Sequence, residues 1–404
     1  MKNKGVITDA ARIDAFLTRG VENIFPKADF VRAKMLRGEQ LTMYYGIDPT
    51  GPNIHLGHLI PIRKLAEFQQ LGHKIYFLIG DFTATIGDPD KASTRKVLTR
   101  KQVLDNCRHY QDQASKFISF SGPNRAELKY NSTWLGKLGF AEVLELASKM
   151  TVQQMLKRDM FELRMKEGSP IHIHEFMYPL MQGYDSVAMD VDGEIGGNDQ
   201  TWNMLAGRDL LKSMKNKDKF VIAMKLLTDP SGKKMGKTEN NAVSLDQTPE
   251  EMFGRIMSWS DSLILPSFEI CTDMPMEEIE SIRKSLESGT NPRDAKVRLA
   301  KAVVTMCHDA AAAEQAFQKF EQTFKKGEMP ADAAEASVAA GTKLADILVS
   351  EKIVASKGEF RRLIEGKGVS EFGSDEPISD PDFKVDKGIS LRIGKKRFVK
   401  ISIK

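Results

Sequence analysis

Cysteine is scarce in this chain of 404 residues, with only Cys107, Cys271 and Cys307. They are odd in number and far apart, so they form neither a disulfide framework nor a CxxC metal or redox motif. The sequence also lacks any run of 18 apolar residues, and Met1 to Arg19 mixes charges without an apolar signal-peptide core. We therefore expect a reduced, cytoplasmic protein with no membrane association.

A strong excess of charge is also missing, because 59 Lys and Arg face 55 Asp and Glu, a net charge of +4. This balance argues against nucleic-acid binding over the whole surface. The excess is local, however: residues 341–404 hold 14 basic and 10 acidic side chains, and this difference equals the net charge of the whole chain. The sequence thus predicts a basic terminal module attached to a neutral body.

The apolar pattern predicts an α/β fold for the first part of the chain. Leu41–Ile47 and Lys74–Ile79 have the composition of strands, and His55–Leu71 has apolar residues at helical spacing. Strand, loop, helix and strand in this order form the unit of a parallel sheet. Ligands bind beyond the carboxyl ends of such strands, where we expect Asp48–His58 and Asp81–Asp88 to lie.

The length predicts two or three domains, since a single core rarely exceeds about 300 residues. We place an α/β domain at 1–240, a helical domain at 241–325, a linker at 326–341 and a terminal module at 342–404. Helical patterns cover Thr248–Trp259, Met276–Ser288 and Pro292–Phe324. The linker is rich in Gly, Pro, Ala and Ser and has no large apolar cluster.

The segment HLGH at the start of the predicted helix contains two histidines three positions apart, His55 and His58. Both imidazoles then share a helix face beside backbone N–H groups that favour an anion. Gly57 allows a ligand to approach the backbone closely. Alternatively, one histidine caps the helix and the other is solvated, or the pair binds zinc, although no further ligands lie nearby.

A second basic loop, SGKKMGKT at Ser231–Thr238, nearly matches a phosphate-binding loop, but its two glycines are one residue too close. It is either a solvated turn or a mobile loop that brings lysines to a pyrophosphate.

In YPLMQGYD, Tyr178, Gln182 and Asp185 form a polar helical stripe that suits an amphoteric ligand or a core network. HIHE at 172–175 could bind a metal, but a helix-starting role for Glu175 suffices.

Five segments taken in order resemble the bacterial tyrosyl-tRNA synthetases, a family of class I aminoacyl-tRNA synthetases. They are Tyr44–His58, Gly87–Pro89, Tyr178–Asp185, Gly196–Gln200 and Lys234–Thr238. HLGH corresponds to the HIGH signature of the family and KMGKT to its KMSKS signature, and the resemblance covers nearly the whole chain. Residues 342–404, with SKGEFRRLIEGKGV and GKKRFVKI, are similar to a small RNA-binding module also found in a ribosomal protein.

The resemblance implies a Rossmann-like parallel-sheet catalytic domain, followed by a helical domain like those that bind anticodons and a small α+β RNA-binding module. It implies that L-tyrosine and ATP form tyrosyl-adenylate and pyrophosphate, and that the tyrosyl group then passes to the 3′ end of tRNA(Tyr). ATP is thus a substrate, Mg²⁺ accompanies it without a dedicated protein site, and no other metal is expected. The family is homodimeric.

The resemblance also implies roles for individual residues. The expected catalytic residues are Thr50, His55, His58, Lys234 and Lys237. The expected tyrosine-binding residues are Tyr44, Asp88, Tyr178, Gln182, Asp185 and Gln200. The expected ATP-binding residues are Asp48, Gly57, Asp199 and Lys237. An ammonium needs a carboxylate and acceptors, whereas a phenol needs a donor and an acceptor at the end of its pocket.

The chain departs from the family pattern at Asp90–Arg95, which lacks the usual Ser-Gly and leaves the roles of Lys91 and Arg95 open. Glu194 stands where many relatives have glutamine. Other readings are an inactive synthetase-like RNA-binding protein, a tryptophanyl-type synthetase and a phosphate-loop kinase. The paired signatures oppose the first, Tyr44 with Asp185 opposes the second, and the short glycine spacing opposes the third.

Overall fold

The computed structural model describes residues 5–88, 98–228, 242–325, 333–351, 353–372, 377–394 and 397–403. The chain divides into two compact units, Met1–Ala310 and Ala311–Lys404, which are described separately below. Lys91, Arg95, Lys234 and Lys237 lie outside the described residues.

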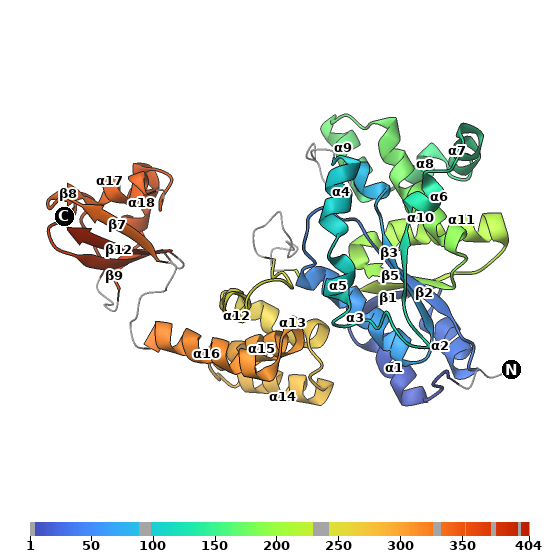
Figure 1. Cartoon of the computed structure of the whole chain (residues 1–404), viewed down its shortest axis with the longest axis horizontal. Coiled ribbons are helices and arrows are strands. Elements are labelled where there is room, and N and C mark those ends of the chain that lie inside the picture. Colours follow the sequence, from blue (N-terminus) through green and yellow to red (C-terminus); the bar gives the residue numbers. More distant parts are fainter. Residues whose placement is uncertain are drawn as a thin grey trace. The chain divides into compact units, whose positions relative to one another are not determined.

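The larger unit is built on a six-stranded sheet with the order β1-β6-β5-β2-β3-β4 (Figure 1). Its strands are β1 (Val21–Phe25), β2 (Thr42–Ile47), β3 (Lys74–Ile79), β4 (Glu127–Tyr130), β5 (Gly193–Gly197) and β6 (Phe220–Met224). All neighbours are parallel except β1, which runs antiparallel to β6 at the edge. Every residue of β6 is buried, as expected of a strand covered on both faces.

The connections of this sheet reverse direction between β2 and β5. The chain passes from β2 through α3 (Leu56–Gln70) to β3 on one side, and from β5 through α11 (Thr201–Lys215) to β6 on the other. Because parallel crossovers are right-handed, these two helices cover opposite faces of the sheet. The space between the carboxyl ends of β2 and β5 is therefore the position where such sheets bind ligands.

Further helices surround the sheet, and α10 packs closely along α11 (Figure 1). They are α1 (Ala10–Thr18), α2 (Ala28–Leu36), α4 (Arg100–Cys107), α5 (Tyr110–Ala114), α6 (Ser132–Leu135), α7 (Phe140–Ala147), α8 (Val152–Met155), α9 (Asp159–Glu167) and α10 (Met177–Met189). Short 3₁₀ helices are η1 (Thr83–Thr85), η2 (Ile173–Phe176), η3 (Asn198–Gln200) and η5 (Asp261–Leu263).

A helical segment follows the sheet. In the larger unit it comprises α12 (Pro249–Met257), α13 (Ile264–Cys271), α14 (Met276–Glu287) and α15 (Pro292–Cys307). The next helix along the chain, α16 (Ala310–Lys325), belongs almost entirely to the second unit. Thr248 caps α12 in a capping box with Glu251, at the start of the helical pattern predicted for Thr248–Trp259. The single helical run predicted for Pro292–Phe324 is wrong, because His308 leaves helical geometry at φ −125° and ψ −102° and separates α15 from α16.

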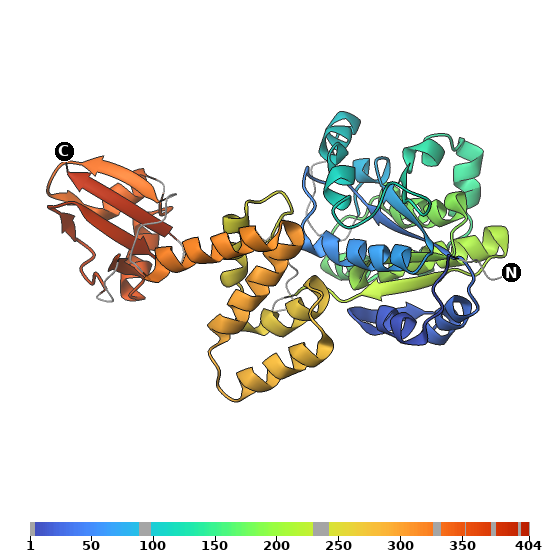
Figure 2. The same ribbon diagram turned by 60° about the horizontal axis from the view of Figure 1, so that its bottom comes forward.

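The terminal module has a four-stranded sheet with the order β7-β12-β11-β9, drawn in orange and red in Figure 2. Its elements are β7 (Ala334–Val338), β8 (Thr342–Lys343), α17 (Leu344–Ser350), α18 (Lys357–Glu365), β9 (Val369–Glu371), β10 (Lys384–Val385), β11 (Ile389–Ile393) and β12 (Arg397–Ile403). Buried residues from both helices and the sheet form its own core, including Leu348, Phe360 and Leu391.

The predicted linker at 326–341 is wrong at residues 334–338, which form β7 and pair in parallel with β12. The pairing is hard to read from sequence, since Ala336 is the one fully buried side chain of an Ala- and Ser-rich strand. The α/β class, the mostly parallel sheet and the strands and helix predicted between residues 41 and 79 are confirmed. In the described ranges, no helix is both long and apolar enough to cross a membrane.

Candidate active site

A pocket of about 290 Å³ opens at the carboxyl ends of β2, β3 and β5, beside the first turn of α3 and one side of α10. Every predicted site residue within the described ranges lines it. These residues are Tyr44, Asp48, Thr50, His55, Gly57, His58, Asp88, Tyr178, Gln182, Asp185, Asp199 and Gln200. The fold therefore brings together side chains that lie up to 156 positions apart in the chain, from Tyr44 to Gln200.

The closed end of the pocket is formed by Tyr44, which is 1% exposed, and Asp185, which is 3% exposed. The Tyr44 hydroxyl lies 3.1 Å from Ser186 Oγ. Asp185 accepts from Trp134 Nε1 at 2.8 Å and from Asn131 Nδ2 at 3.3 Å. Burial raises the pKa values of Tyr44 and Asp185 well above their usual values, and nearby carboxylates add to both shifts.

Asp48 and Tyr178 form a second polar group along the wall. Tyr178 donates its hydroxyl proton to Asp48 Oδ2 at 2.9 Å, and Thr83 Oγ1 donates to the other carboxylate oxygen at 2.7 Å. This geometry requires a glycine at position 80, because a Cβ there would lie 2.0 Å from Asp48 Oδ1 and 2.4 Å from Thr83 Oγ1. Burial and the carboxylate of Asp48 raise the pKa of Tyr178 well above its usual value, so its hydroxyl keeps its proton.

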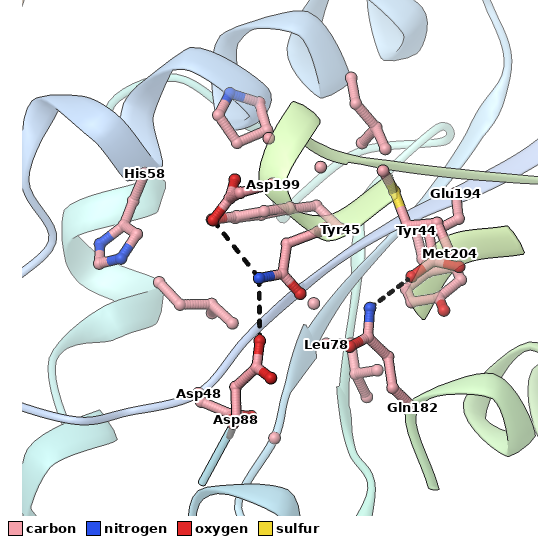
Figure 3. A pocket seen from close by; sticks show the side chains of 18 of the residues that line it. Tyr44, Tyr45, Asp48, His58, Leu78, Asp88, Gln182, Glu194, Asp199 and Met204 are labelled. Atoms are coloured by element: carbon pink, nitrogen blue, oxygen red, sulfur yellow. Dashed lines mark hydrogen bonds between the residues drawn. The ribbon is translucent and has the colours of Figure 1, made fainter. Parts of the chain in front are cut away.

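Asp88 is held from two sides. Arg158 Nη2 donates to Asp88 Oδ1 at 2.6 Å. Gln200 Nε2 donates to Asp88 Oδ2 at 3.1 Å, and this bond is the dashed line that reaches Asp88 in Figure 3. Arg158 is 7% exposed and lies over the rings of Phe161 and Trp202. The carboxylate is thus fixed in place, with part of its charge already balanced by the guanidinium.

The two histidines of HLGH meet as the i and i+3 spacing predicts. His55 is the extended residue that caps α3, His58 lies in the first turn, and their rings stack with centroids 3.6 Å apart. Both residues line the pocket, and Figure 3 shows the His58 ring at its edge. The backbone N–H groups at the start of α3 provide a favourable site for an anion.

The other polar segments also have clear positions. Gly196–Gln200 leads from β5 through η3 into α11 and brings Asp199 to the pocket. Glu175 binds Arg164 and accepts from the His172 backbone N–H at 2.8 Å, which is the helix-starting role expected for HIHE. Within the described ranges, no group of three or more His, Cys, Asp and Glu side chains could hold a metal ion.

Several residues that support the site were missed by the sequence analysis. They are Thr83, Asn131, Trp134, Arg158, Ser186 and Lys219. Asn131 gave one usable signal, because it directly follows a strand and so lies at the carboxyl edge of the sheet. Arg158 gave none, since it comes from the segment between two short helices and reaches Asp88 only in the folded chain.

Comparisons with known proteins agree with this geometry. A family described as class I tRNA synthetases (W and Y) matches residues 36–325. The fold is similar to that of a mitochondrial tyrosyl-tRNA synthetase from Coccidioides posadasii, with a TM-score of 0.61 and 26% identity over 77% of this chain and 91% of that one. The tyrosyl-tRNA synthetase of Archaeoglobus fulgidus shares the fold alone, with a TM-score of 0.61 and 21% identity over 76% of this chain and 99% of that one.

The fold and the pocket thus define a class I aminoacyl-tRNA synthetase. The chain is 42% identical to the tyrosine-tRNA ligase of Shewanella oneidensis over 98% of this chain and all of that protein. It is also 42% identical to the tyrosine-tRNA ligase of Carboxydothermus hydrogenoformans, over 95% and 96% of the two chains. Accordingly, the chain belongs to the tyrosine-tRNA ligase family and is an enzyme that aminoacylates tRNA.

Proposed function

We propose that this pocket binds L-tyrosine and ATP side by side, forms tyrosyl-adenylate, and then transfers the tyrosyl group to the 3′ end of tRNA(Tyr). The observation that carries the proposal is that the predicted tyrosine-binding and ATP-binding side chains of the described ranges line one pocket. Neither step needs a covalent enzyme intermediate. Such a reaction depends on positioning and on stabilisation of developing charge, which histidines, lysines and backbone amides provide.

Tyrosine is proposed to enter with its phenol toward Tyr44 and Asp185. Since a phenol both donates and accepts, a carboxylate that accepts and a tyrosine hydroxyl that donates suit the end of the pocket. Asp185 makes two hydrogen bonds and keeps capacity for a third. The ammonium group is proposed to lie near Asp88, Tyr178 and Gln182, where fixed oxygens are available. Gln200, through its bond to Asp88, would hold this end.

ATP is proposed to lie against the first turn of α3. The stacked imidazoles of His55 and His58, with Thr50, would stabilise the pyrophosphate side of the transition state, and the helix N-terminus favours the negative charge there. Gly57 would let the nucleotide approach the backbone. Asp48 and Asp199 would position the substrates, with Asp199 at the ribose. Lys234 and Lys237 are proposed from sequence alone to close over the phosphates, and Mg²⁺ to arrive with ATP.

The tRNA is proposed to contact the parts of the chain beyond the catalytic domain, which we place at 1–240. By its likeness to the family, the helical domain at 241–325 would bind near the anticodon. In the terminal module, which begins at 342 in our division, α18 buries Phe360 and Ile364 and exposes Lys357, Arg361 and Arg362. A basic helix face of this kind suits the phosphate backbone of RNA. These substrates favour a cytoplasmic location.

A homodimer is proposed as the working form. Large apolar side chains are exposed within residues 140–173, where a monomer would be expected to present polar groups. They are Phe140 at 78%, Leu144 at 55%, Val152 at 58%, Leu163 at 52%, Met165 at 60% and Ile173 at 83% exposure. Sedimentation equilibrium tests the proposal. The unmodified chain should have the mass of a dimer, and Phe140→Asp should shift this mass toward that of a monomer. A monomer mass for the unmodified chain would reject the proposal.

The proposed reaction is tested by exchange of pyrophosphate with ATP, measured separately with each of the twenty amino acids. We expect exchange with tyrosine alone. His55→Ala should lower kcat by roughly a hundredfold with little change in the KM for tyrosine, since it removes a group that acts on the transition state. His109→Ala is the matched control, because His109 lies exposed beyond α4. Exchange with another amino acid, or none with folded protein, would reject the assignment.

A further inference from the structure

Lys219 is completely buried, although lysine is almost never found inside a protein without a partner. It directly precedes β6 and does not line the pocket. An ammonium group in an apolar interior is costly unless it is paired and hydrogen-bonded. Burial lowers the pKa of Lys219, and the carboxylate of Glu194 opposes this shift.

The strand register brings Lys219 to the tyrosine end of the pocket. Glu194 on β5 pairs with Tyr44 on β2 and with Val221 on β6. Since alternate residues of a strand share a face, Lys219 points to the same face as Val221, beside Glu194 and Tyr44. A glycine at position 207 of α11 makes room, because a Cβ there would lie 2.7 Å from Lys219 Nζ.

The Lys219 ammonium links two side chains that line the pocket. It forms an ion pair with Glu194, whose other oxygen accepts from Gln182 Nε2 at 3.2 Å (Figure 3). It also donates to Ser186 Oγ at 2.7 Å, and this hydroxyl lies 3.1 Å from the Tyr44 hydroxyl. One cation therefore orients both Gln182, through Glu194, and Tyr44, through Ser186.

Charge gives Lys219 a second effect on this region. Glu194 and Asp185 are both buried, at 2% and 3% exposure, and each acts electrostatically on Tyr44. Two uncompensated carboxylates in a low-dielectric interior would repel each other strongly. Because Lys219 is paired to Glu194, this ion pair adds no net charge beside Asp185.

We propose that Lys219 is a positioning residue for tyrosine recognition: through its ion pair with Glu194 and its bond to Ser186, it sets the orientation of Gln182 and Tyr44. The proposal rests on the assignment of Gln182 and Tyr44 to the tyrosine site. It also gives a physical reason why a glutamate can be buried at position 194. A glutamate there requires a cation behind it, whereas a glutamine requires none.

The test compares Lys219→Met, Glu194→Gln and the double variant in tyrosine-dependent pyrophosphate exchange. Lys219→Met leaves a buried carboxylate unpaired, so we expect the KM for tyrosine to rise about tenfold while the KM for ATP changes little. The double variant removes both charges and keeps an amide beside Gln182, so the KM for tyrosine should return to within about threefold of the unmodified enzyme.

Two results would overturn the proposal: an unchanged KM for tyrosine in Lys219→Met, or a double variant as impaired as Lys219→Met. If Lys219→Met does not fold, the double variant and Ser186→Ala still decide the matter, because Ser186→Ala should reduce selection against phenylalanine through Tyr44. The proposal and the pocket assignment fail differently. If the assignment is wrong, Tyr44→Phe in the same assay leaves discrimination against phenylalanine unchanged, whereas failure of the Lys219 proposal alone leaves that effect intact.

Discussion

The Tyr44 hydroxyl is a buried polar group whose partners lie within the protein and, as proposed, in the substrate. Its protein neighbour is Ser186 Oγ at 3.1 Å. Phenylalanine would bring no hydroxyl to this end of the pocket, so the polar groups there would stay unpaired. Recognition of the phenol therefore depends less on attraction to tyrosine than on the cost that phenylalanine incurs.

Tyr44→Phe tests whether the Tyr44 hydroxyl takes part in recognition of the substrate phenol. The variant removes one hydroxyl and keeps the ring, so packing in the buried site is preserved. We expect the ratio of kcat/KM for tyrosine over phenylalanine to fall about tenfold, with a smaller loss in tyrosine activation itself. The measurement is pyrophosphate exchange with each amino acid, and Tyr76→Phe, on the neighbouring β3, serves as the control. Unchanged discrimination would contradict the phenol assignment.

His73 gives a pH dependence to the stability of the larger unit. It is fully buried, stacks on Phe68, and accepts from the Leu41 backbone N–H at 3.2 Å. Burial lowers the pKa of His73 from 6.5 to about 4. The unfolded chain therefore takes up a proton in this pH range that the folded chain does not, so the stabilisation is complete above pH 6.5 and is lost as the pH falls toward 4.

His73→Asn keeps an acceptor for Leu41 and removes the titration. Between pH 6.5 and 4, the free energy of unfolding of the unmodified chain should fall more steeply than that of the variant, by up to about 1.4 kcal/mol per pH unit. Tryptophan fluorescence during urea unfolding measures this, because Trp134, Trp202 and Trp259 all belong to the larger unit. If the free energies of unfolding of the two proteins fall in parallel with pH, His73 is not the group that causes the pH dependence.

At the scale of elements, the close packing of α10 on α11 brings Gln182, Asp185 and Ser186 to the sheet. Gly183 and Gly207 allow this approach, since a Cβ on Gly183 would lie 2.6 Å from Leu210 Cδ1 and 3.2 Å from the Gly207 backbone. A helix surface with a small residue at the contact lets the second helix come near. The position of the pocket wall therefore depends on two residues that carry no side chain.

Gly183→Ala should destabilise the larger unit by about 1–3 kcal/mol and raise the KM for tyrosine, because the added methyl group pushes α10 away from α11. Gly254→Ala in α12 is the matched control, since a Cβ there meets nothing within 4 Å. The control should be neutral or stabilising by up to about 1 kcal/mol. Urea unfolding and pyrophosphate exchange measure both properties, and equal behaviour of the two variants would refute the packing argument.

Local elements could be predicted here because their signals are local. The HLGH turn, the strand before it and the helix predicted from Thr248 each follow from a few neighbouring residues, and the structure confirms them. The break at His308 and the strand β7 could not be read in this way. In β7, the strand is stabilised by its pairing with β12, more than 60 positions later in the chain.

The same limit applies to the site. Motifs predicted the residues that line the pocket, but the groups that hold them come from elsewhere in the fold. Arg158 reaches Asp88 across 70 positions, and Lys219 reaches Glu194 through the register of two strands. Sequence spacing alone contains no information about such pairs, because a shift of one residue in register would turn Lys219 to the other face.

At the scale of the whole molecule, the terminal module differs in charge from the rest of the chain. The terminal module has a core of its own around Leu348, Phe360 and Leu391. Residues 341–404 carry the entire net charge of the chain, and Arg361 and Arg362 stand exposed on α18. The distribution favours a division of work, with chemistry in the neutral part of the chain, residues 1–340, and electrostatic attraction of RNA in residues 341–404.

Ending the chain after Lys325 should therefore separate the two activities. The proposed pocket lies within the larger unit, so tyrosine-dependent exchange should stay within about threefold of the full chain. Charging of tRNA at physiological salt should fall at least tenfold, because counterion release from RNA is lost with the basic residues. Equal loss of both activities would instead show that the terminal module is needed for the catalytic fold.

Salt dependence makes the same argument quantitative in the full chain. For affinity measured by filter binding, the slope of log K for tRNA against log salt should become shallower by about 0.7 for each phosphate contact removed from single-stranded RNA. Arg361→Gln with Arg362→Gln removes two such contacts and should thus reduce the slope by about 1.4, whereas Arg12→Gln, an exposed arginine on α1, should leave it unchanged. If the double variant and Arg12→Gln change the slope equally, the RNA does not contact Arg361 and Arg362. A charge that touches no phosphate only alters the general electrostatic field, so its removal does not change the number of counterions released.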